Sequence, residues 1–259
     1  MTLVPSIEGR RPTVGLFVTC LVDLFRPSVG IAATKLLRDA GCSVEVPVAQ
    51  ACCGGSSQGQ DAGEDLEANL KATITTFERC DFVVVPSGSC ADMLKRQCAS
   101  TFAEDAGWNR QATQFAGRVH ELTSFLVDVL GVSRVGARMT GSVTYHDTCC
   151  GASAPRVQEQ PRRLLRSVSG IHLKEPESAA GCCGLRTQGT AAAAMRIREA
   201  GAGTVTSDNL GCLMYMATQL RRDGSAIEVR HVAEVLAGMH ETPPIGGVAR
   251  QSARVAQDS

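Results

Sequence analysis

Cys52-Cys53-Gly54 is a triplet that returns as Cys149-Cys150-Gly151 and again as Cys182-Cys183-Gly184. Twelve cysteines scattered at random over 259 residues would give only about half an adjacent pair. Adjacent cysteines cannot easily form a disulfide with each other, but both can reach one multi-metal centre. Because glycine lacks a Cβ, it lets the backbone turn tightly beside such a centre. The triplets therefore indicate selection for chemistry or for backbone geometry.

Single cysteines flank the triplets at similar distances in the two halves of the chain. The pattern is C-x31-CCG-x35-C in the first half and C-x32-CCG-x27-C in the second. Such self-similarity indicates an internal duplication. Each repeat supplies four thiols, the number that holds a [4Fe–4S] cluster. The predicted ligands are Cys20, Cys52, Cys53 and Cys90 in the first repeat and Cys149, Cys182, Cys183 and Cys212 in the second.

The same eight thiols have two other interpretations. Zinc also accepts four thiolates, but zinc sites usually draw paired ligands from short C-x2-4-C knuckles, which favours iron–sulfur here. Free cysteine also packs as a small hydrophobic residue. That second interpretation suits Cys42, Cys80 and Cys98, which have no partner in the repeat. Cys150 is either a group supporting the second site or an ordinary loop residue. We therefore expect one or two clusters per chain.

Strands and helices alternate along the sequence, which predicts an α/β fold with parallel sheets and right-handed crossovers. The architecture expected is two Rossmann-like halves from the duplication, each carrying one CCG motif. The first repeat should span residues 12–130 and the second residues 139–238, with a linker over residues 131–138 and a disordered tail over residues 241–259. The expected strands cover residues 13–19, 43–48, 81–86, 141–146, 171–174, 204–206 and 226–230, and the expected helices cover residues 28–40, 64–79, 162–167, 191–200 and 231–237.

Composition excludes several classes of function. The chain has 26 basic and 26 acidic residues, so no global field attracts nucleic acid or an anionic membrane. No apolar stretch approaches the length of a membrane span. Twelve cysteines without a signal peptide predict a cytoplasmic protein with metal-bound or reduced thiols. The glycines that follow Cys53 lack the Gly-x-Gly-x-x-Gly phosphate fingerprint, so nucleotide binding is not predicted.

Beyond the triplets, four stretches of the chain resemble a known group of proteins. The twofold Cys-Cys-Gly arrangement is similar to the cysteine-rich domain found in a subunit of heterodisulfide reductase. The remainder resembles the lactate-utilisation protein A group of iron–sulfur oxidoreductases over roughly residues 12–238. The matching stretches are Pro-Ser-Gly-Ser-Cys-Ala-Asp-Met at residues 86–93, Tyr-His-Asp-Thr-Cys at 145–149, Asn-Leu-Gly-Cys-Leu-Met at 209–214 and Val-Arg-His-Val-Ala-Glu-Val-Leu at 229–236.

The resemblance implies an electron-transfer subunit of a system that oxidises L-lactate to pyruvate together with companion iron–sulfur subunits. A cluster-based thiol or disulfide reductase of the heterodisulfide reductase type is the alternative. The C-x-x-C that ends each repeat of the heterodisulfide reductase domain is missing after Cys90 and Cys212, which weighs against it. A non-enzymatic, zinc-stapled scaffold is the third candidate.

Several further side chains have specific expectations. His146 is either structural or donates a hydrogen bond near Cys149. Asp92 and Asp208 are expected to be exposed near the cysteines, on the face where a companion subunit docks. Arg162 is expected on a solvated helix face together with Arg163 and Arg166.

Overall fold

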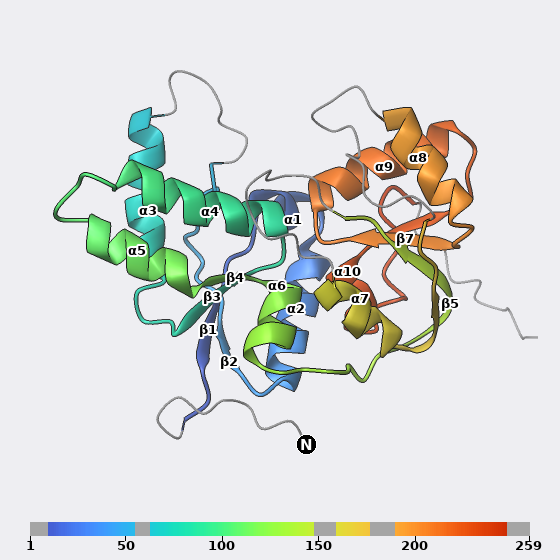
Figure 1. Ribbon diagram of the computed structural model, residues 1–259, viewed down its shortest axis with the longest axis horizontal. Coiled ribbons are helices and arrows are strands. Elements are labelled where there is room, and N and C mark those ends of the chain that lie inside the picture. The colour runs from blue at the N-terminus through green and yellow to red at the C-terminus, as the bar shows by residue number, and fades with distance from the viewer. Residues whose placement is uncertain (1–9, 55–62, 148–158, 177–189, 248–259) are drawn as a thin grey trace, which may run out of the picture.

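Two four-stranded sheets, one in each half of the chain, form the framework of the molecule (Figure 1). The computed structural model describes residues 10–54, 63–147, 159–176 and 190–247. Every pairing between neighbouring strands in both sheets is parallel. The predicted α/β class with two parallel-sheet halves is therefore confirmed.

The first half contains four strands, six helices and one π-helical turn among the described residues. They are β1 (Thr13–Leu16), α1 (Cys20–Phe25), α2 (Pro27–Asp39), β2 (Ser43–Glu45), α3 (Gly63–Thr76), β3 (Phe82–Val85), α4 (Gly88–Thr101), α5 (Asn109–Arg118), β4 (Val119–Glu121), α6 (Leu122–Ser124) and the π-helical turn η1 (Phe125–Val129). The second half contains β5 (Arg138–Tyr145), α7 (Glu159–Arg166), β6 (Ser169–Leu173), α8 (Thr190–Glu199), β7 (Thr204–Ser207), α9 (Leu210–Arg222), β8 (Glu228–His231) and α10 (Val232–Leu236).

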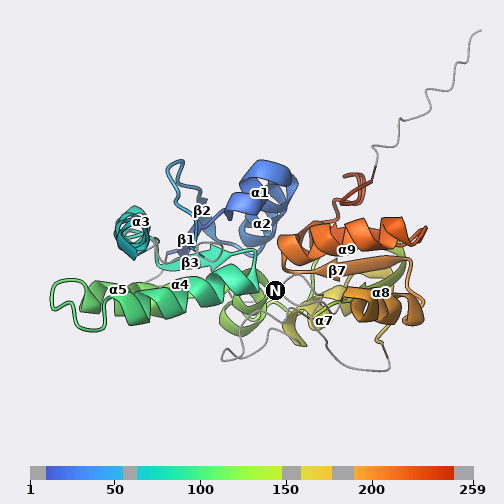
Figure 2. The ribbon, with the colours of Figure 1, turned by 90° about the horizontal axis from the view of Figure 1, so that it is seen from above.

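The two sheets have the same topology. The strand order is β2-β1-β3-β4 in the first sheet and β6-β5-β7-β8 in the second. The central strand β3 of the first sheet is a short apolar run, Phe-Val-Val-Val, which suits a sheet covered on both faces. Figure 2 shows this covering in the second half, where α9 lies on one side of β7 and α7 and α8 lie on the other. The duplication read from the cysteines thus extends to the whole sheet.

The two halves pack against each other through helices of both. Helix α2 of the first half packs against α10 of the second, and α7 of the second packs against α6 and η1 of the first. One hydrophobic cluster accordingly contains Val14 and Leu36 from the first half together with Val143, Leu164 and Leu236 from the second. The core is therefore shared between the halves, and the strand ends of both sheets are held in a defined relation.

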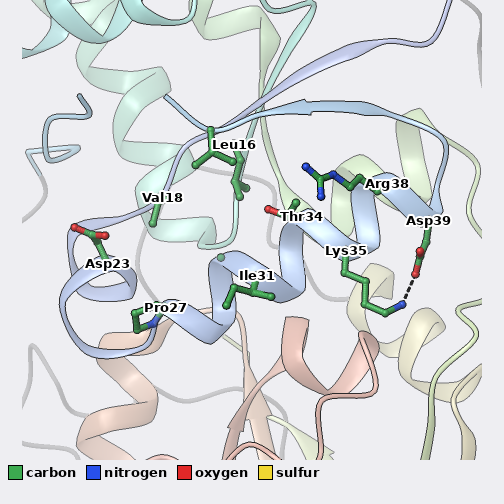
Figure 3. A pocket seen from close by; sticks show the side chains of 11 residues that line it. Leu16, Val18, Asp23, Pro27, Ile31, Thr34, Lys35, Arg38 and Asp39 are labelled. Atoms are coloured by element: carbon green, nitrogen blue, oxygen red, sulfur yellow. Dashed lines mark hydrogen bonds and ion pairs between the residues drawn. The ribbon is translucent and has the colours of Figure 1, made fainter. Parts of the chain in front are cut away.

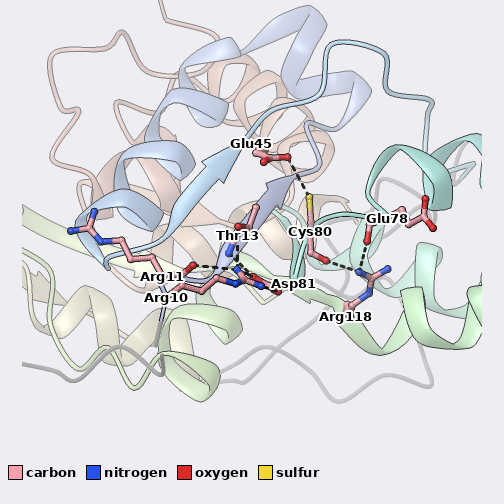
Figure 4. Close-up of polar contacts among 8 residues, drawn as sticks. All are labelled: Arg10, Arg11, Thr13, Glu45, Glu78, Cys80, Asp81 and Arg118. Carbon is pink, nitrogen blue, oxygen red and sulfur yellow. Dashed lines mark hydrogen bonds and ion pairs between the residues drawn. The ribbon is translucent and has the colours of Figure 1, made fainter. Parts of the chain in front are cut away.

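Polar contacts stabilise the amino-terminal edge of the first sheet, at the ends of the strands away from the predicted ligand cysteines. Arg10 forms two 2.7 Å hydrogen bonds to Asp81, which also accepts from the backbone N–H of Thr13 (Figure 4). These contacts hold the pKa of Asp81 below its ordinary value, chiefly through the hydrogen bond from Arg10. Arg118 donates to the carbonyl oxygens of Glu78 and Cys80. This edge is structural.

The structure differs from the sequence prediction at several places, among them helices α1, α5 and α9, which were not predicted. Strand β4 was not predicted, because it is three residues long and only Val119 in it is an apolar strand former. Residues 241–247, the beginning of the tail expected to be disordered, pack on the second half: Ile245 is buried, and Arg230 donates to the carbonyl oxygen of Thr242 at 2.6 Å. Residues 248–259 lie outside the described residues. No helix in the described part of the chain is long and apolar enough to cross a membrane.

Candidate metal centre

The cysteines of the first repeat all follow strands. Cys20 begins α1 just after β1, Cys52 and Cys53 lie in the loop after β2, and Cys90 lies in the first turn of α4 after β3. The carboxyl ends of parallel strands meet at one edge of the sheet, which is where ligands of open α/β sheets gather. The fold therefore brings residues that are far apart in the sequence to one place.

The thiols of Cys20 and Cys52 are in direct contact, with their Sγ atoms 3.6 Å apart. The pKa of Cys20 is raised to about 11, first by burial, then by the hydrogen bond with Cys52 and by the negative charges that Cys52 and Cys53 carry as thiolates. Without a cation nearby, Cys20 therefore stays protonated at neutral pH.

Cys90 joins the same group. Its pKa is lowered, chiefly because the thiol of Cys53 hydrogen-bonds to it, and Ser87 adds a second hydrogen bond, while burial opposes both. Cys20 and Cys52 raise the pKa of Cys90 through their charges. Its place in the first turn of the 14-residue helix α4 also favours a thiolate. All four predicted ligands of the first repeat thus interact with one another.

This donor set fits an iron–sulfur cluster. Four soft sulfur ligands meet in one place, and their mutual repulsion means that they can all be thiolates together only when a cation is present. Among the described residues, no three Cys, His, Asp or Glu side chains form a ready-made site for a single metal ion. The thiols are gathered together without being arranged around one point.

Gly54 explains why the triplet ends in glycine. Its φ is +80°, in the left-handed region that other residues rarely adopt, and a Cβ there would lie 2.7 Å from the Leu66 side chain. The turn that presents Cys52 and Cys53 therefore depends on glycine, as the sequence predicts.

Cys212 occupies the place in the second half that Cys90 occupies in the first. It lies in the first turn of α9 after β7, fully buried, and its backbone N–H donates to Oδ1 of the N-cap residue Asn209 at 3.0 Å. The other ligands predicted for the second repeat, Cys149, Cys182 and Cys183, lie outside the described residues, as does Cys150. The second site therefore remains a prediction.

Three cysteines without a counterpart in the repeat are core residues, as the sequence predicts. Cys42, Cys80 and Cys98 are all buried. Burial raises the pKa of Cys42 to about 11 and that of Cys98 to about 12, so both remain thiols at neutral pH. For Cys80, burial and the nearby carboxylate of Glu45 raise the pKa to about 11 (Figure 4).

Arg162 is not on a solvated helix face, contrary to the sequence prediction. It is 8% exposed and forms a bidentate ion pair with Asp147 at 2.7 and 2.8 Å, and it also pairs with Glu175 at 3.0 Å. Its guanidinium lies 5.1 Å from the centre of the Tyr145 ring. Arg162 points inward because it pairs with Asp147, which follows β5, and packs against the ring of Tyr145. Close by, the Nε2 atom of His146 is buried without a hydrogen-bond partner among the described residues.

The two aspartates expected on an exposed docking face are not exposed. Asp92 pairs with Arg96 at 2.7 Å and its side chain is 11% exposed. Asp208 is 2% exposed and lies between the two halves of the molecule. Sequence reasoning also missed Glu121, a buried carboxyl whose pKa is raised to about 7, first by burial and then by the charge of Asp208. Its position at the end of the unpredicted strand β4 gave no signal in the sequence.

Exposed apolar side chains gather on the first half beside the cysteines. Leu24 and Phe25 of α1 are 71% and 60% exposed, and Val48 lies fully exposed in the loop that leads to Cys52. An open groove of about 600 Å³ also lies on the first half, with Ile31 and Thr34 of α2 on one wall and Val18 on the other (Figure 3). None of the predicted ligands that the structure describes lines the groove.

The chain is similar to several known proteins. The family described as cysteine-rich domain, CCG, matches residues 14–95 and 143–217. Lactate utilization protein A from Geobacillus sp. (strain WCH70) is 39% identical over 234 residues, which are 86% of this chain and 98% of the relative. The protein of the same name from Anoxybacillus flavithermus is 38% identical over 236 residues, with the same two coverages.

Solved structures are more distant. A periplasmic solute-binding protein of an ABC transporter from Actinobacillus succinogenes, with bound D-allose, matches with a TM-score of 0.30 and 13% identity, covering 85% of this chain and 77% of that one. A likeness at this level carries no argument about function.

Proposed function

Because the chain belongs to the family of lactate utilization protein A and carries the cysteine-rich CCG domain, we propose that it is an iron–sulfur electron-transfer component of a system that oxidises L-lactate to pyruvate. The observation that carries the proposal is the meeting of Cys20, Cys52, Cys53 and Cys90 at the carboxyl edge of the first sheet. These four thiolates would hold one [4Fe–4S] cluster, which takes up and releases single electrons when bound. A second cluster would use the ligands predicted in the second repeat.

The electron balance of the reaction requires other components. Oxidation of lactate to pyruvate removes two electrons and two protons, and a centre that carries one electron at a time must act twice or together with a second centre. The sequence has no fingerprint for a hydride-accepting nucleotide. We therefore propose that companion iron–sulfur subunits exchange electrons with this chain.

The first prediction concerns metal content. Protein purified without oxygen should be brown and should contain iron and acid-labile sulfide in nearly equal amounts, because each cubane cluster holds as many sulfides as irons. Chemical analysis for iron, sulfide and zinc, together with EPR of the reduced protein, measures this directly. A colourless protein that retains zinc and has no labile sulfide would contradict the proposal and favour the zinc-stapled scaffold.

The second prediction concerns dependence on partners. The isolated chain should not oxidise L-lactate with NAD or with a dye acceptor, whereas the chain mixed with its companion subunits should. The substitution Leu24→Asp should weaken binding of the companion subunits, because it puts a charge among the exposed apolar side chains next to Cys20. Binding is measured by titration of the purified components.

Met195→Asp is the matched control, since Met195 is also exposed and apolar but lies on α8 of the second half. It should leave binding unchanged, and both variants should keep their iron. Fast lactate turnover by the isolated chain would make this protein the catalyst itself. Equal weakening by both substitutions would show that the docking surface does not adjoin Cys20.

A further inference from the structure

The turn that precedes Cys90 and the turn that precedes Cys212 are hydrogen-bonded to each other across the boundary between the two halves. In the first half, Gly88 and Ser89 directly precede Cys90; in the second, Asp208 and Asn209 precede Cys212. Oδ2 of Asp208 accepts a 2.7 Å hydrogen bond from the backbone N–H of Gly88. Nδ2 of Asn209 donates a 2.7 Å hydrogen bond to Oγ of Ser89. Both contacts join residues 120 positions apart, and we call these four residues, Gly88, Ser89, Asp208 and Asn209, the clasp.

The clasp is closely fitted. A Cβ on residue 88 would lie 2.6 Å from Oδ2 of Asp208, so only glycine admits the carboxylate to the backbone there. Asn209 uses its other side-chain atom, Oδ1, to accept from the N–H of Cys212. One side chain therefore contacts both turns. The second half holds Asp208 in place, because its carbonyl oxygen is 3.1 Å from Nε2 of His231 and its Oδ1 is 3.4 Å from the hydroxyl of Tyr145.

We propose that Asp208 and Asn209 of the second half are positioning residues for Cys90 of the first half, so that the first cysteine site is complete only when the halves are docked. The functional meaning of this inference rests on the proposed role of Cys90 as a cluster ligand. The geometry of the clasp does not, since it involves only side chains and backbone of the chain itself. A turn that is fixed before the cluster binds holds its thiol near the geometry that the metal needs.

A buried carboxyl group beside the clasp makes it sensitive to pH. Oε2 of Glu121 accepts from the hydroxyl of Thr123 and the N–H of Ser124, while Oε1 has no hydrogen-bond partner among the described residues. The groups that face Glu121 from other elements are Asp208 from the turn after β7 and Tyr145 from β5; His231, at the end of β8, reaches Asp208 rather than Glu121.

The direction of the pH effect follows from the charge of Glu121. Its pKa is raised from 4.5 to about 7, first by burial and then by the charge of Asp208. A carboxyl group whose pKa is raised by folding stabilises the folded state fully below its unfolded pKa, and this contribution is lost as the pH rises through the folded pKa. The clasp should therefore be fully closed below about pH 4.5, and it should loosen progressively between about pH 4.5 and 7, because ionisation of Glu121 beside the charge of Asp208 increasingly favours opening.

The experiment measures how often the Cys90 turn opens in the metal-free, reduced chain. A small alkylating reagent labels each cysteine, and mass spectrometry of the peptides gives a rate for each one. Asp208→Ala removes the acceptor of a charge-assisted hydrogen bond, so labelling of Cys90 should be about tenfold faster. Asp208→Asn keeps the shape and an amide oxygen as a weaker acceptor, so its effect should be about threefold.

Two comparisons separate local opening from unfolding. Asp223→Ala is the matched control, because Asp223 also lies at an end of α9 and forms a 2.6 Å ion pair with Arg198, but far from the clasp. It should leave the rate at Cys90 unchanged. Cys42, buried in the core, reports global unfolding. If Asp208→Ala accelerates the labelling of Cys42 as much as that of Cys90, that variant unfolds globally. The labelling of Cys90 in the milder variant Asp208→Asn then tests the proposal.

The pH arm uses Glu121→Gln, which imitates the protonated carboxyl. The ratio of Cys90 labelling in the wild-type chain to that in Glu121→Gln should be near one at about pH 4, should rise between about pH 4.5 and 7 and should level off above about pH 7, because the ionisation of the thiol cancels in the ratio. A purely structural role of Asp208 would leave this ratio constant.

The outcomes distinguish this inference from the proposed function. Unchanged Cys90 labelling in both Asp208 variants, or a ratio that does not depend on pH, would overturn the clasp even if the protein holds iron. Faster labelling at Cys90 in a protein that binds no iron would leave the clasp standing and remove the iron–sulfur function. If the clasp and the iron–sulfur function are both correct, the Asp208→Ala protein purified without oxygen should also lose iron from the site that contains Cys90, although the substitution is in the other half.

Discussion

The substitutions Cys53→Ser and Cys90→Ser are each expected to remove the iron of the first site. Both thiols belong to the group of four that meet at the carboxyl edge of the first sheet, and the hydrogen bond between them is the largest influence on the pKa of Cys90. A serine hydroxyl is a harder ligand than a thiolate and ionises far less readily, so it holds iron–sulfur clusters poorly. Iron and sulfide per chain, with the EPR signal of the reduced protein, measure the loss.

The chain contains a matched control on the same helix as Cys90. Cys98 lies eight residues further along α4, fully buried in the core of the first half. Cys98→Ser and Cys42→Ser put a hydroxyl in an apolar place and should each cost about 1–3 kcal/mol of stability without loss of iron. If all four serine variants lose iron equally, the division of the cysteines into ligands and core residues is wrong.

Much of the fold could be predicted from the sequence, because the repeated cysteine spacing reveals the duplication. The spacing of the cysteines sets the repeat, and apolar runs such as residues 82–85 mark the buried strands that a repeat contains. The structure confirms two parallel sheets with the same strand order. Strand β4 escaped detection because three residues with His120 and Glu121 among them carry no periodic signal, and its pairing with β3 alone makes it a strand.

The positions of the cysteines could be predicted better than their surroundings. Each predicted ligand of the first repeat follows a strand, and a parallel sheet brings such residues to one edge. The burial of Asp208 and Arg162 could not be predicted in this way. Each depends on a partner that the docking of elements brings to it, Gly88 for the first and Asp147 for the second. Charged residues are normally exposed unless they are paired, and the sequence alone does not reveal the pairing.

A second large effect is expected from Glu234→Ala, which should destabilise the whole protein. Glu234 is fully buried in α10 of the second half and binds two residues of the first. Its carboxylate accepts from Nε of Arg26 at 2.9 Å and from the hydroxyl of Ser28 at 2.6 Å, and it also caps its own helix by accepting from the N–H of His231. The contacts with Arg26 and Ser28 span more than 200 residues of sequence. They tie α10 to the start of α2, where the halves dock.

Removing this carboxylate leaves the guanidinium of Arg26, only 12% exposed, without its counter-charge, although its bond to the carbonyl oxygen of Pro243 remains. Breaking a buried ion pair from one side typically costs about 3–5 kcal/mol, a large part of the roughly 5–15 kcal/mol that stabilises a domain. Chemical unfolding of the metal-free protein should therefore shift to much lower denaturant. Asp39→Ala breaks the exposed Lys35–Asp39 pair of α2 and should change stability by about 0.5 kcal/mol or less. If the two variants unfold alike, the Arg26–Glu234 contact does not hold the halves together.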